Sequence, residues 1–215
     1  MKPTAKTSKA KAQATPDRNV RADAQRNLDA LLDAAKAVFS TAGVNAPVRE
    51  IATRAGVGVA TFYRHFPLRS DLVAAVFRRE VDACAATSHQ FAREHEPAEA
   101  LARWLRRYTS FIVTKRGLAA ALHSGDPAFN SLPAYFQQNL EPALAALLDA
   151  AVQAGQIRND IKPSALLRAV ANLSIATDDD DGALNSKRMV DLLIDGLRYG
   201  APKAGSALKR QRNSR

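Results

Sequence analysis

The sequence predicts an all-α protein, and three observations lead to this fold class. Ala- and Leu-rich stretches whose apolar residues recur at threes and fours fill the chain between its two ends. Pro and Gly residues separate these stretches. No run alternates apolar and polar residues in the way a half-buried strand would. We therefore expect helices throughout the body of the chain.

The first half of this body contains four expected helices. The first covers residues 23–42 and ends at Gly43, because glycine commonly follows the last helical turn. Short helices follow at residues 48–55 and 59–66. A longer one begins at Ser70, with Asp71 in its first turn, where a carboxylate suits the helix dipole. The segment 23–69 is thus predicted to be a three-helix domain.

The second half, residues 70–200, is predicted to be a separate helical domain. Its first helix runs into the 80s, and the polar stretch 93–97 separates it from the next. Further helical patterns occur at residues 97–114, 116–123, 132–154, 163–177 and 186–200. The acidic run Asp178–Asp181 is expected to be a solvated loop.

The positive charge is concentrated at the two ends of the chain. Of a formal net charge of +10, residues 1–26 carry +5 and residues 201–215 carry another +5. We expect residues 1–22 and 201–215 to be disordered, because they contain almost no large apolar side chain. Such basic arms suit a polyanion, and they serve equally well as solubilising tails.

Composition excludes several classes of protein. Cys84 is the only cysteine in the 215 residues, so neither an intrachain disulfide nor a multi-cysteine zinc site is available. We expect a reducing, cytoplasmic location, because no apolar block resembles a membrane span or a signal peptide. No cofactor is expected. No metal site is expected either, since His89, His95 and His123 lack close spacing with carboxylates.

The segment from Pro47 to Phe66 is the most informative part of the sequence. Two short helices joined by a tight turn cross steeply, so they need a small residue at the crossing and a turn residue that tolerates positive φ. Ala52 and Gly56 meet these needs at the right spacing. The residues expected to form the core of this unit are Ile51, Ala55, Val57 and Phe62. The spacing predicts a helix-turn-helix.

The outer face of its second helix offers groups that can bind DNA. Ala60, Thr61, Tyr63, Arg64 and His65 supply a methyl group, hydroxyls, a guanidinium and an imidazole. Taken alone, a Tyr and a His there are more often surface or core-edge residues. Residues 44–79, however, also carry six arginines against Glu50 and Asp71. These arginines are Arg49, Arg54, Arg64, Arg69, Arg78 and Arg79.

These residues closely resemble the signature of TetR/AcrR family regulators, over about residues 24–75. The matching string is Ile51-Ala52-x-x-Ala55-Gly56-Val57-x-x-x-Thr61-Phe62-Tyr63-x-His65-Phe66-x-x-Arg69-x-x-Leu72. The resemblance implies a homodimer that binds double-stranded operator DNA, with the third helix in the major groove. The variable C-terminal domain of this family binds an inducer and forms the dimer.

Carried over by position, the resemblance gives the site residues their roles. Thr61 would lie at the DNA, and Tyr63 and His65 on or near phosphates. Arg69 would stand at the usual Lys position at the start of the fourth helix. The base-reading residues would be Val59, Ala60 and Arg64, and Arg49 belongs to the surrounding positive charge.

Two positions depart from the family pattern. Pro47 stands where the family usually has a Thr, so a hydroxyl for capping and phosphate contact is missing, although Pro suits a first helical turn. Gly58 replaces the usual Ser or Thr cap of the reading helix. As a cap, this replacement costs only roughly a few tenths of a kcal/mol.

The C-terminal half resembles the SbtR-like type of TetR C-terminal domain, which would pair helices 163–177 and 186–200 with their two-fold mates. The candidate interface residues are Leu166, Val170, Leu173, Leu193 and Leu197. An intrachain core explains this stripe equally well.

The same domain is expected to hold a pocket among its middle helices for a small apolar or amphipathic inducer. The candidate lining residues are Trp104, Tyr108, Phe111, His123, Phe129 and Phe136. Each of these side chains is individually more typical of a packed core.

Two other classes of function compete with this interpretation. An enzyme is not expected, because no nucleophile elbow, phosphate-binding loop, dinucleotide turn or metal-binding helix motif is present. An architectural protein would coat DNA through its basic tails with little sequence preference. The expected function is a sequence-specific transcription regulator, and repression relieved by an inducer follows from the resemblance.

Overall fold

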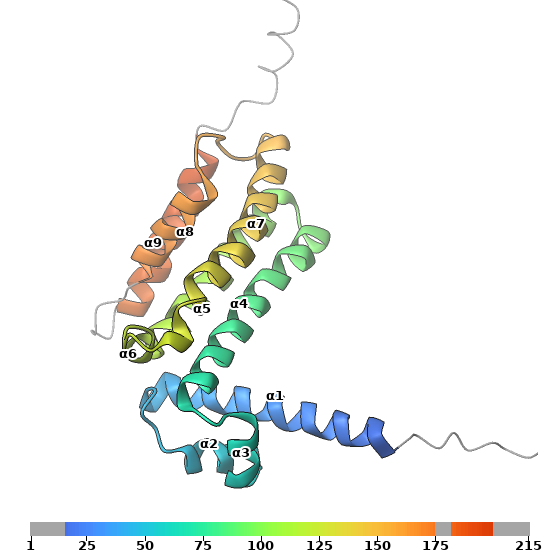
Figure 1. Ribbon diagram of the computed structural model, residues 1–215. Helices are drawn as coiled ribbons and strands as arrows, with labels where there is room; N and C mark the ends of the chain where they lie inside the picture. Colours follow the sequence, from blue (N-terminus) through green and yellow to red (C-terminus); the bar gives the residue numbers. More distant parts are fainter. Residues whose placement is uncertain (1–15, 175–181, 200–215) are drawn as a thin grey trace, which may run out of the picture.

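The computed structural model describes residues 16–174 and 182–199, and every regular element within these ranges is a helix, as predicted. Figure 1 shows a small head made of α1 (Pro16–Ala42), α2 (Val48–Ala55) and α3 (Val59–His65) at one end of a longer body. The helix α4 (Arg69–Glu94) leaves the head and runs along the body. Among the described helices, none combines the length and the apolar character needed to cross a membrane.

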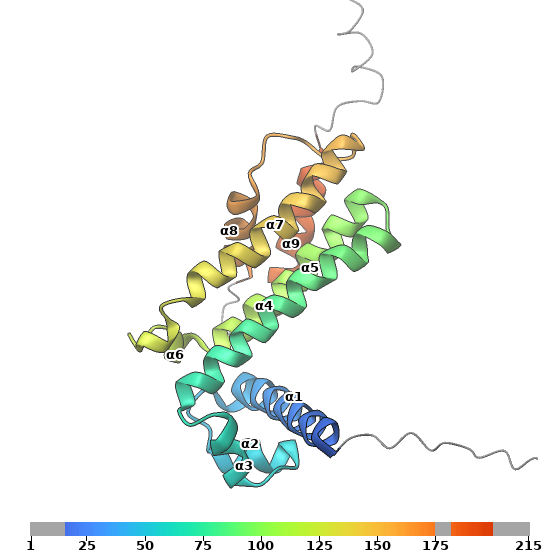
Figure 2. The same ribbon diagram turned by 45° about the vertical axis from the view of Figure 1, so that its right-hand side comes forward.

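Three long helices form the centre of the body. The remaining elements in chain order are α5 (Pro97–Gly117), α6 (Ala119–Leu122), the 3₁₀ turn η1 (Pro127–Phe129), α7 (Leu132–Gln153), α8 (Pro163–Leu173) and α9 (Gly182–Arg198). Helices α4, α5 and α7 pack against one another, and α8 and α9 cover α5 and contact each other (Figure 2). The short elements α6 and η1 lie at the end of the body nearest the head (Figure 1).

Several helix boundaries differ from prediction: α4 extends to Glu94, beyond the 80s, and α5 extends to Gly117, beyond residue 114. Helix α1 begins at Pro16 rather than residue 23, because a proline is pre-organised for a first helical turn and residues 16–22 then continue a helical pattern. Residues 16–22, which were predicted to be part of a disordered N-terminal arm, are therefore helical. Helix α9 begins at Gly182 rather than residue 186. The rest of the two predicted tails, and the run Asp178–Asp181, lie outside the described residues.

The turn η1 was not predicted from the sequence. The Asp126 carboxylate accepts a hydrogen bond from the Ala128 N–H at 2.9 Å, so a side chain sets this turn. The consequence is the burial of Phe129, which is 7% exposed. The segment between α6 and α7 is therefore a packed part of the body.

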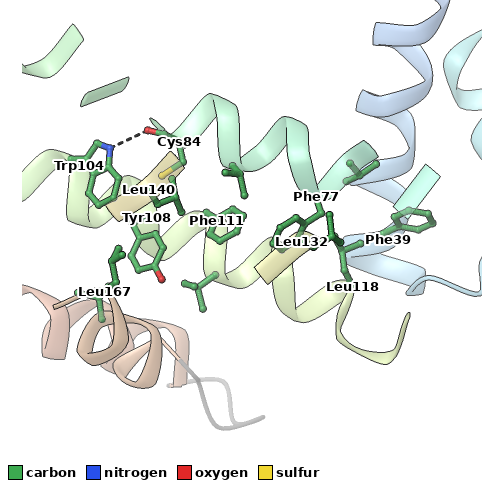
Figure 3. Close-up of a cluster of buried hydrophobic side chains, with 14 of the residues drawn as sticks. Phe39, Phe77, Cys84, Trp104, Tyr108, Phe111, Leu118, Leu132, Leu140 and Leu167 are labelled. Carbon is green, nitrogen blue, oxygen red and sulfur yellow. Dashed lines mark hydrogen bonds between the residues drawn. The ribbon is translucent and has the colours of Figure 1, made fainter. Parts of the chain in front are cut away.

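A row of aromatic side chains runs through the core of the body (Figure 3). Trp104 is fully buried, and its Nε1–H donates to the Cys84 carbonyl at 3.0 Å. Its ring stacks on Tyr108 with centroids 5.7 Å apart, and Tyr108 stacks on Phe111 at 5.9 Å. Phe111 in turn meets Phe77 of α4 edge to face at 5.8 Å. These contacts join the middle of α5 to the middle of α4.

The head is joined to the body by packing and by buried charge. A Cβ at Gly117 would lie 3.0 Å from the Phe39 carbonyl oxygen, so the end of α5 approaches α1 closely enough that a side chain there would force a small shift of the backbone. Nearby, the buried Glu80 carboxylate lies 2.8 Å from Lys36 Nζ of α1 and 3.7 Å from Arg107 Nη2 of α5. One carboxylate therefore links α1, α4 and α5.

The burial of Cys84 predicts an inert thiol. The side chain is fully buried, and burial raises its pKa to about 12. Because the thiolate is the nucleophile, we expect iodoacetamide at about pH 8 to leave Cys84 unmodified in the native protein. Mass spectrometry should show full alkylation once concentrated guanidinium unfolds the chain. Rapid alkylation of the native protein would contradict this packing.

Candidate DNA interface and ligand cavity

The turn between α2 and α3 depends on one glycine. Gly56 lies in the left-handed region with φ of 68°, where side-chain-bearing residues are strained. Its N–H donates to the Thr53 carbonyl at 3.1 Å, and the Val57 N–H donates to the Ala52 carbonyl at 3.0 Å. These bonds close the end of α2 in a Schellman-type turn. The predicted role of Gly56 is confirmed.

This geometry predicts that substitutions of two neighbouring glycines, Gly56 and Gly58, have different effects on stability. Gly56→Ala should lower the free energy of unfolding by about 1–2 kcal/mol, the cost of a Cβ in the left-handed region. Gly58 has φ of −70° at the N-cap of α3, and open space surrounds its Cβ position. Gly58→Ser should therefore leave stability unchanged or raise it by roughly a few tenths of a kcal/mol. Urea unfolding of both variants checks this, and equal losses would contradict the turn geometry.

Helix α3 has one buried face and one exposed face. Phe62 is 1% exposed and packs into the head beside the buried Phe66, with ring centroids 5.9 Å apart. The exposed face consists of Val59, Ala60, Tyr63 and Arg64, and Tyr63 is 52% exposed. Thr61 and His65, also predicted to contact DNA, are half-buried on the flank between the two faces.

The six predicted arginines divide into two groups of three. Arg49, Arg54 and Arg64 are exposed, and within the described residues none of them makes an ion pair. Arg78 instead donates to Ser131 Oγ at 3.1 Å, and Arg79 lies 3.0 Å from the Asp33 carboxylate of α1. The interpretation that all six arginines surround the DNA site therefore overestimates its free positive charge.

Arg69 occupies a structural position at the start of α4. Its guanidinium donates to the carbonyls of Val44 and Ala46, the latter at 2.7 Å, in the loop between α1 and α2. The Asp71 carboxylate accepts from the Leu68 N–H at 3.1 Å and caps α4, as its position in the first turn predicts. Arg69 therefore fixes the loop that precedes α2, and its donors point into the protein.

A cavity of about 530 Å³ lies in the body among α5, α7 and α8. It is lined by Phe77, Tyr108, Ile112, Lys115, Leu122, His123, Phe129, Leu132, Pro133, Phe136, Gln137, Glu141, Ser164, Leu167, Arg168 and Ala171. Four of the six predicted lining residues are among them: Tyr108, His123, Phe129 and Phe136.

Trp104 and Phe111 do not line the cavity, contrary to prediction. Both are at most 1% exposed, and both stack against Tyr108 from within the core. The charged lining residues Lys115, Glu141 and Arg168 were not predicted from the sequence. They come from three different helices, so only the tertiary fold brings them together. Over the described residues, no cluster of His, Cys, Asp and Glu is suited to a metal ion.

The predicted dimer residues fall into two classes. Leu166, Val170 and Leu197 are at most 3% exposed and belong to the core of this chain. Leu166 and Val170 are therefore packed inside this chain, whereas Leu197 also borders a surface groove. Leu173 and Leu193 are half-buried and line a shallow groove beside α9.

Helix α9 presents a second apolar face to the outside. Met189 is 40%, Leu192 64% and Tyr199 84% exposed, and Gly196 lies between the last two on the same face. The spacing of three, four and three residues puts all of these positions on one side of the helix. Such a contiguous apolar stripe is typical of a protein interface.

Comparison with known proteins gives consistent results for both halves of the chain. Residues 31–76 match the model of bacterial regulatory proteins of the tetR family, and residues 96–199 match that of the SbtR-like transcriptional regulator C-terminal domain. A TetR transcriptional regulator from Streptomyces coelicolor is 38% identical, with a TM-score of 0.70 over 82% of this chain and 99% of that one.

Two further relatives agree with this result. A TetR regulatory protein from Mycobacterium vanbaalenii is 32% identical, with a TM-score of 0.66 over 83% of this chain and 99% of its own. An HTH-type transcriptional regulator of Staphylococcus aureus is 28% identical over 123 residues, which is 56% of this chain. The match spans 66% of the length of that relative.

Proposed function

Because the chain belongs to the TetR family of bacterial transcription regulators, we propose that it binds a palindromic operator as a homodimer and represses until a small ligand releases it. One observation carries the proposal. The four residues on the exposed face of α3 leave an open surface that no other element of the described chain covers, although α3 itself is anchored by the buried Phe62.

The exposed face of α3 is suited to the major groove. Arg64 can donate two hydrogen bonds to a guanine, and the methyl groups of Val59 and Ala60 can contact thymine. Tyr63 projects far enough to donate its hydroxyl to a phosphate, and His65 and Thr61 flank it for backbone contacts. Base reading is thus assigned to Val59, Ala60 and Arg64.

Two exposed cations on α2 extend the DNA surface. Arg49 lies in the first turn of α2, where the helix has no side-chain cap and its free N–H groups favour an anion. Arg54 lies in the last turn of the same helix. We assign Arg49 to a phosphate contact. Arg69 acts indirectly, because it holds the loop that sets the start of α2.

The dimer is assigned to the outer face of α9. Met189, Leu192 and Tyr199 form the apolar stripe described above, and the groove with Leu173 and Leu193 continues it toward α8. Pairing two such stripes about a two-fold axis would bury them, with Gly196 allowing close approach. This assignment replaces Leu166, Val170 and Leu197 as interface residues.

Phe77 and Phe129 connect the ligand cavity to the head. Phe77 lines the cavity and belongs to α4, which follows α3 in the chain. Phe129 lines the same cavity and also a smaller one of about 280 Å³, whose other wall includes Asn45 and Arg69. A ligand that displaces these rings would shift α4 and the loop before α2. It must bind the two states unequally to release DNA.

Selection from random duplex DNA at physiological salt tests this function. The full chain should enrich a palindrome, and Arg64→Ala should relax the preference at symmetric positions of that palindrome. The exposed Arg93→Ala, on the far end of α4, serves as a control and should enrich the original site. Salt-sensitive binding without enrichment would contradict the proposal and favour an architectural protein.

A further inference from the structure

We infer that the ligand of the cavity is a small amphipathic carboxylate, whose acidic group binds between Lys115 and Arg168 while its apolar body lies among the aromatic rings. This inference rests on the proposed ligand-released regulator and adds the chemical class of the ligand.

The walls of the cavity are mainly apolar and aromatic. Phe77, Tyr108, Phe129 and Phe136 contribute four rings from α4, α5, η1 and α7. Aliphatic side chains such as Ile112, Leu132 and Leu167 fill the spaces between them. Figure 3 shows Tyr108 with its hydroxyl directed toward the helix that carries Leu167. Such walls suit a hydrocarbon or aryl body and disfavour a sugar or a nucleotide.

Two cations line this apolar space from different helices, the half-buried Lys115 and the exposed Arg168. Lys115 is in the last turn of α5, and Arg168 is in the middle of α8. The Lys115 Nζ lies 5.6 Å from the centroid of the Phe136 ring, and within the described residues neither cation makes an ion pair. A cation held over an aromatic wall without a carboxylate partner is suited to an anionic ligand.

The single carboxylate of the lining, Glu141, makes no ion pair with Lys115 or Arg168 among the described residues. Glu141 lies five residues after Phe136 on α7, about 7.5 Å further along the helix axis. It already accepts a hydrogen bond from Gln137 Nε2 at 3.1 Å. With two cations against one carboxylate, the lining is net positive even with His123 neutral. It therefore favours a monoanion over an amine.

Tyr108 supplies a hydrogen-bond donor to the cavity, and its contact with Trp104 allows ligand binding to be followed by fluorescence. Burial raises the pKa of Tyr108, so its hydroxyl stays protonated and can donate to a carboxylate. The ring stacks on Trp104 at an interplanar angle of 5°, and Trp104 is the only tryptophan of the chain. A ligand that contacts Tyr108 should therefore change the fluorescence of one identifiable residue.

The test compares three probes that share one apolar body: decanoate, decan-1-ol and decylamine. Titration calorimetry and Trp104 fluorescence should show decanoate binding at least about tenfold more tightly than the alcohol, as expected of a charge-assisted contact. Decylamine should bind most weakly. Equal affinities, tighter binding of the amine, or no binding of decanoate would each overturn the inference.

Variants of the lining sharpen the test. Lys115→Gln and Arg168→Gln should each weaken decanoate binding by roughly tenfold and leave decanol unchanged. Glu141→Gln should strengthen decanoate binding, because it removes a like charge. Lys162→Gln, an exposed residue just before α8 that does not line the cavity, is the matched control and should bind decanoate normally. Unchanged decanoate binding in both cation variants would overturn the inference.

The inference and the proposed function fail in different ways. If random DNA selection yields a palindrome but decanoate does not bind, the carboxylate assignment fails and the regulator stands. If decanoate binds as described but no DNA sequence is enriched, the cavity assignment stands and the operator function fails.

Discussion

Replacing Tyr63 by Ala is expected to lower operator affinity about ten- to hundredfold, through the loss of one hydroxyl–phosphate bond of about 1.5–3 kcal/mol. The accompanying loss of stability should be no more than about 0.5–1.5 kcal/mol, the worth of one aromatic pair. The side chain is 52% exposed on α3, and its only described ring contact is the edge-to-face pair with Phe62 at 5.4 Å. Because Tyr63 is uncharged, the salt dependence of binding should keep its slope. Fluorescence anisotropy with labelled operator at several salt concentrations measures both quantities.

The adjacent residue provides the matched contrast. Phe62 is 1% exposed in the core of the head, so Phe62→Ala should lower the free energy of unfolding by about 3–5 kcal/mol. Thermal unfolding should therefore separate two residues that are neighbours in sequence. Unchanged operator affinity in Tyr63→Ala would mean that the exposed face of α3 is not the DNA surface.

Leu192→Glu is expected to convert the dimer to monomers and to lower affinity for a palindrome by roughly 10²–10⁴-fold. The loss is this large because a dimer binds both half-sites in one linked event, whereas each monomer must bind its half-site independently. Leu192 is 64% exposed at the centre of the outer face of α9, so the new carboxylate should not disturb the fold of the single chain. Sedimentation velocity gives the oligomeric state, and the same anisotropy assay gives the affinity.

Lys187→Glu is the control for this change in charge. Lys187 is exposed on the same helix, on the side away from the apolar stripe, so this variant should remain dimeric and bind the operator. A dimer that survives Leu192→Glu would place the interface elsewhere. Monomers that nevertheless bind the palindrome with full affinity would contradict the need for a dimer.

The helix-turn-helix could be predicted from sequence because its determinants are local. Gly56 must follow α2 in a left-handed conformation, Ala52 must be small where the two helices cross, and Phe62 must be buried, each at a fixed distance along the chain. All three requirements fall within residues 52–62. Over so short a stretch, the spacing of residues along the chain determines how the two helices meet. The boundaries of α2 were therefore predicted as observed, and those of α3 to within one residue.

The orientation of α9 could not be predicted for a physical reason. The helix has two apolar faces, one with Val190, Ile194 and Leu197 and the other with Met189 and Leu192. Periodicity shows that apolar residues share a side but does not show which side packs inward. Only the contacts of α9 with α5 and α8 decide this, and they place Leu197 in the core.

The cavity, too, could be predicted only in part from the sequence, because its lining depends on the tertiary fold. The bulky residues of its walls were found by type, but Trp104 and Phe111 have the same apolar character and lie one layer deeper. Lys115 and Arg168 belong to helices separated by more than forty residues, so no local pattern unites them. The same limit applies to Arg69, whose partners in the α1–α2 loop precede it by 23 and 25 residues.

The most direct test of the account is the dependence of binding on the spacing of the two half-sites. A dimer that presents two α3 helices to one face of DNA requires half-sites about one helical turn apart. Inserting about five base pairs, half a turn, at the centre of the selected palindrome should abolish most of the specific affinity. Inserting a full turn should restore less than the original affinity. Unchanged binding after the half-turn insertion would contradict the claim that this protein reads its operator as a dimer through α3.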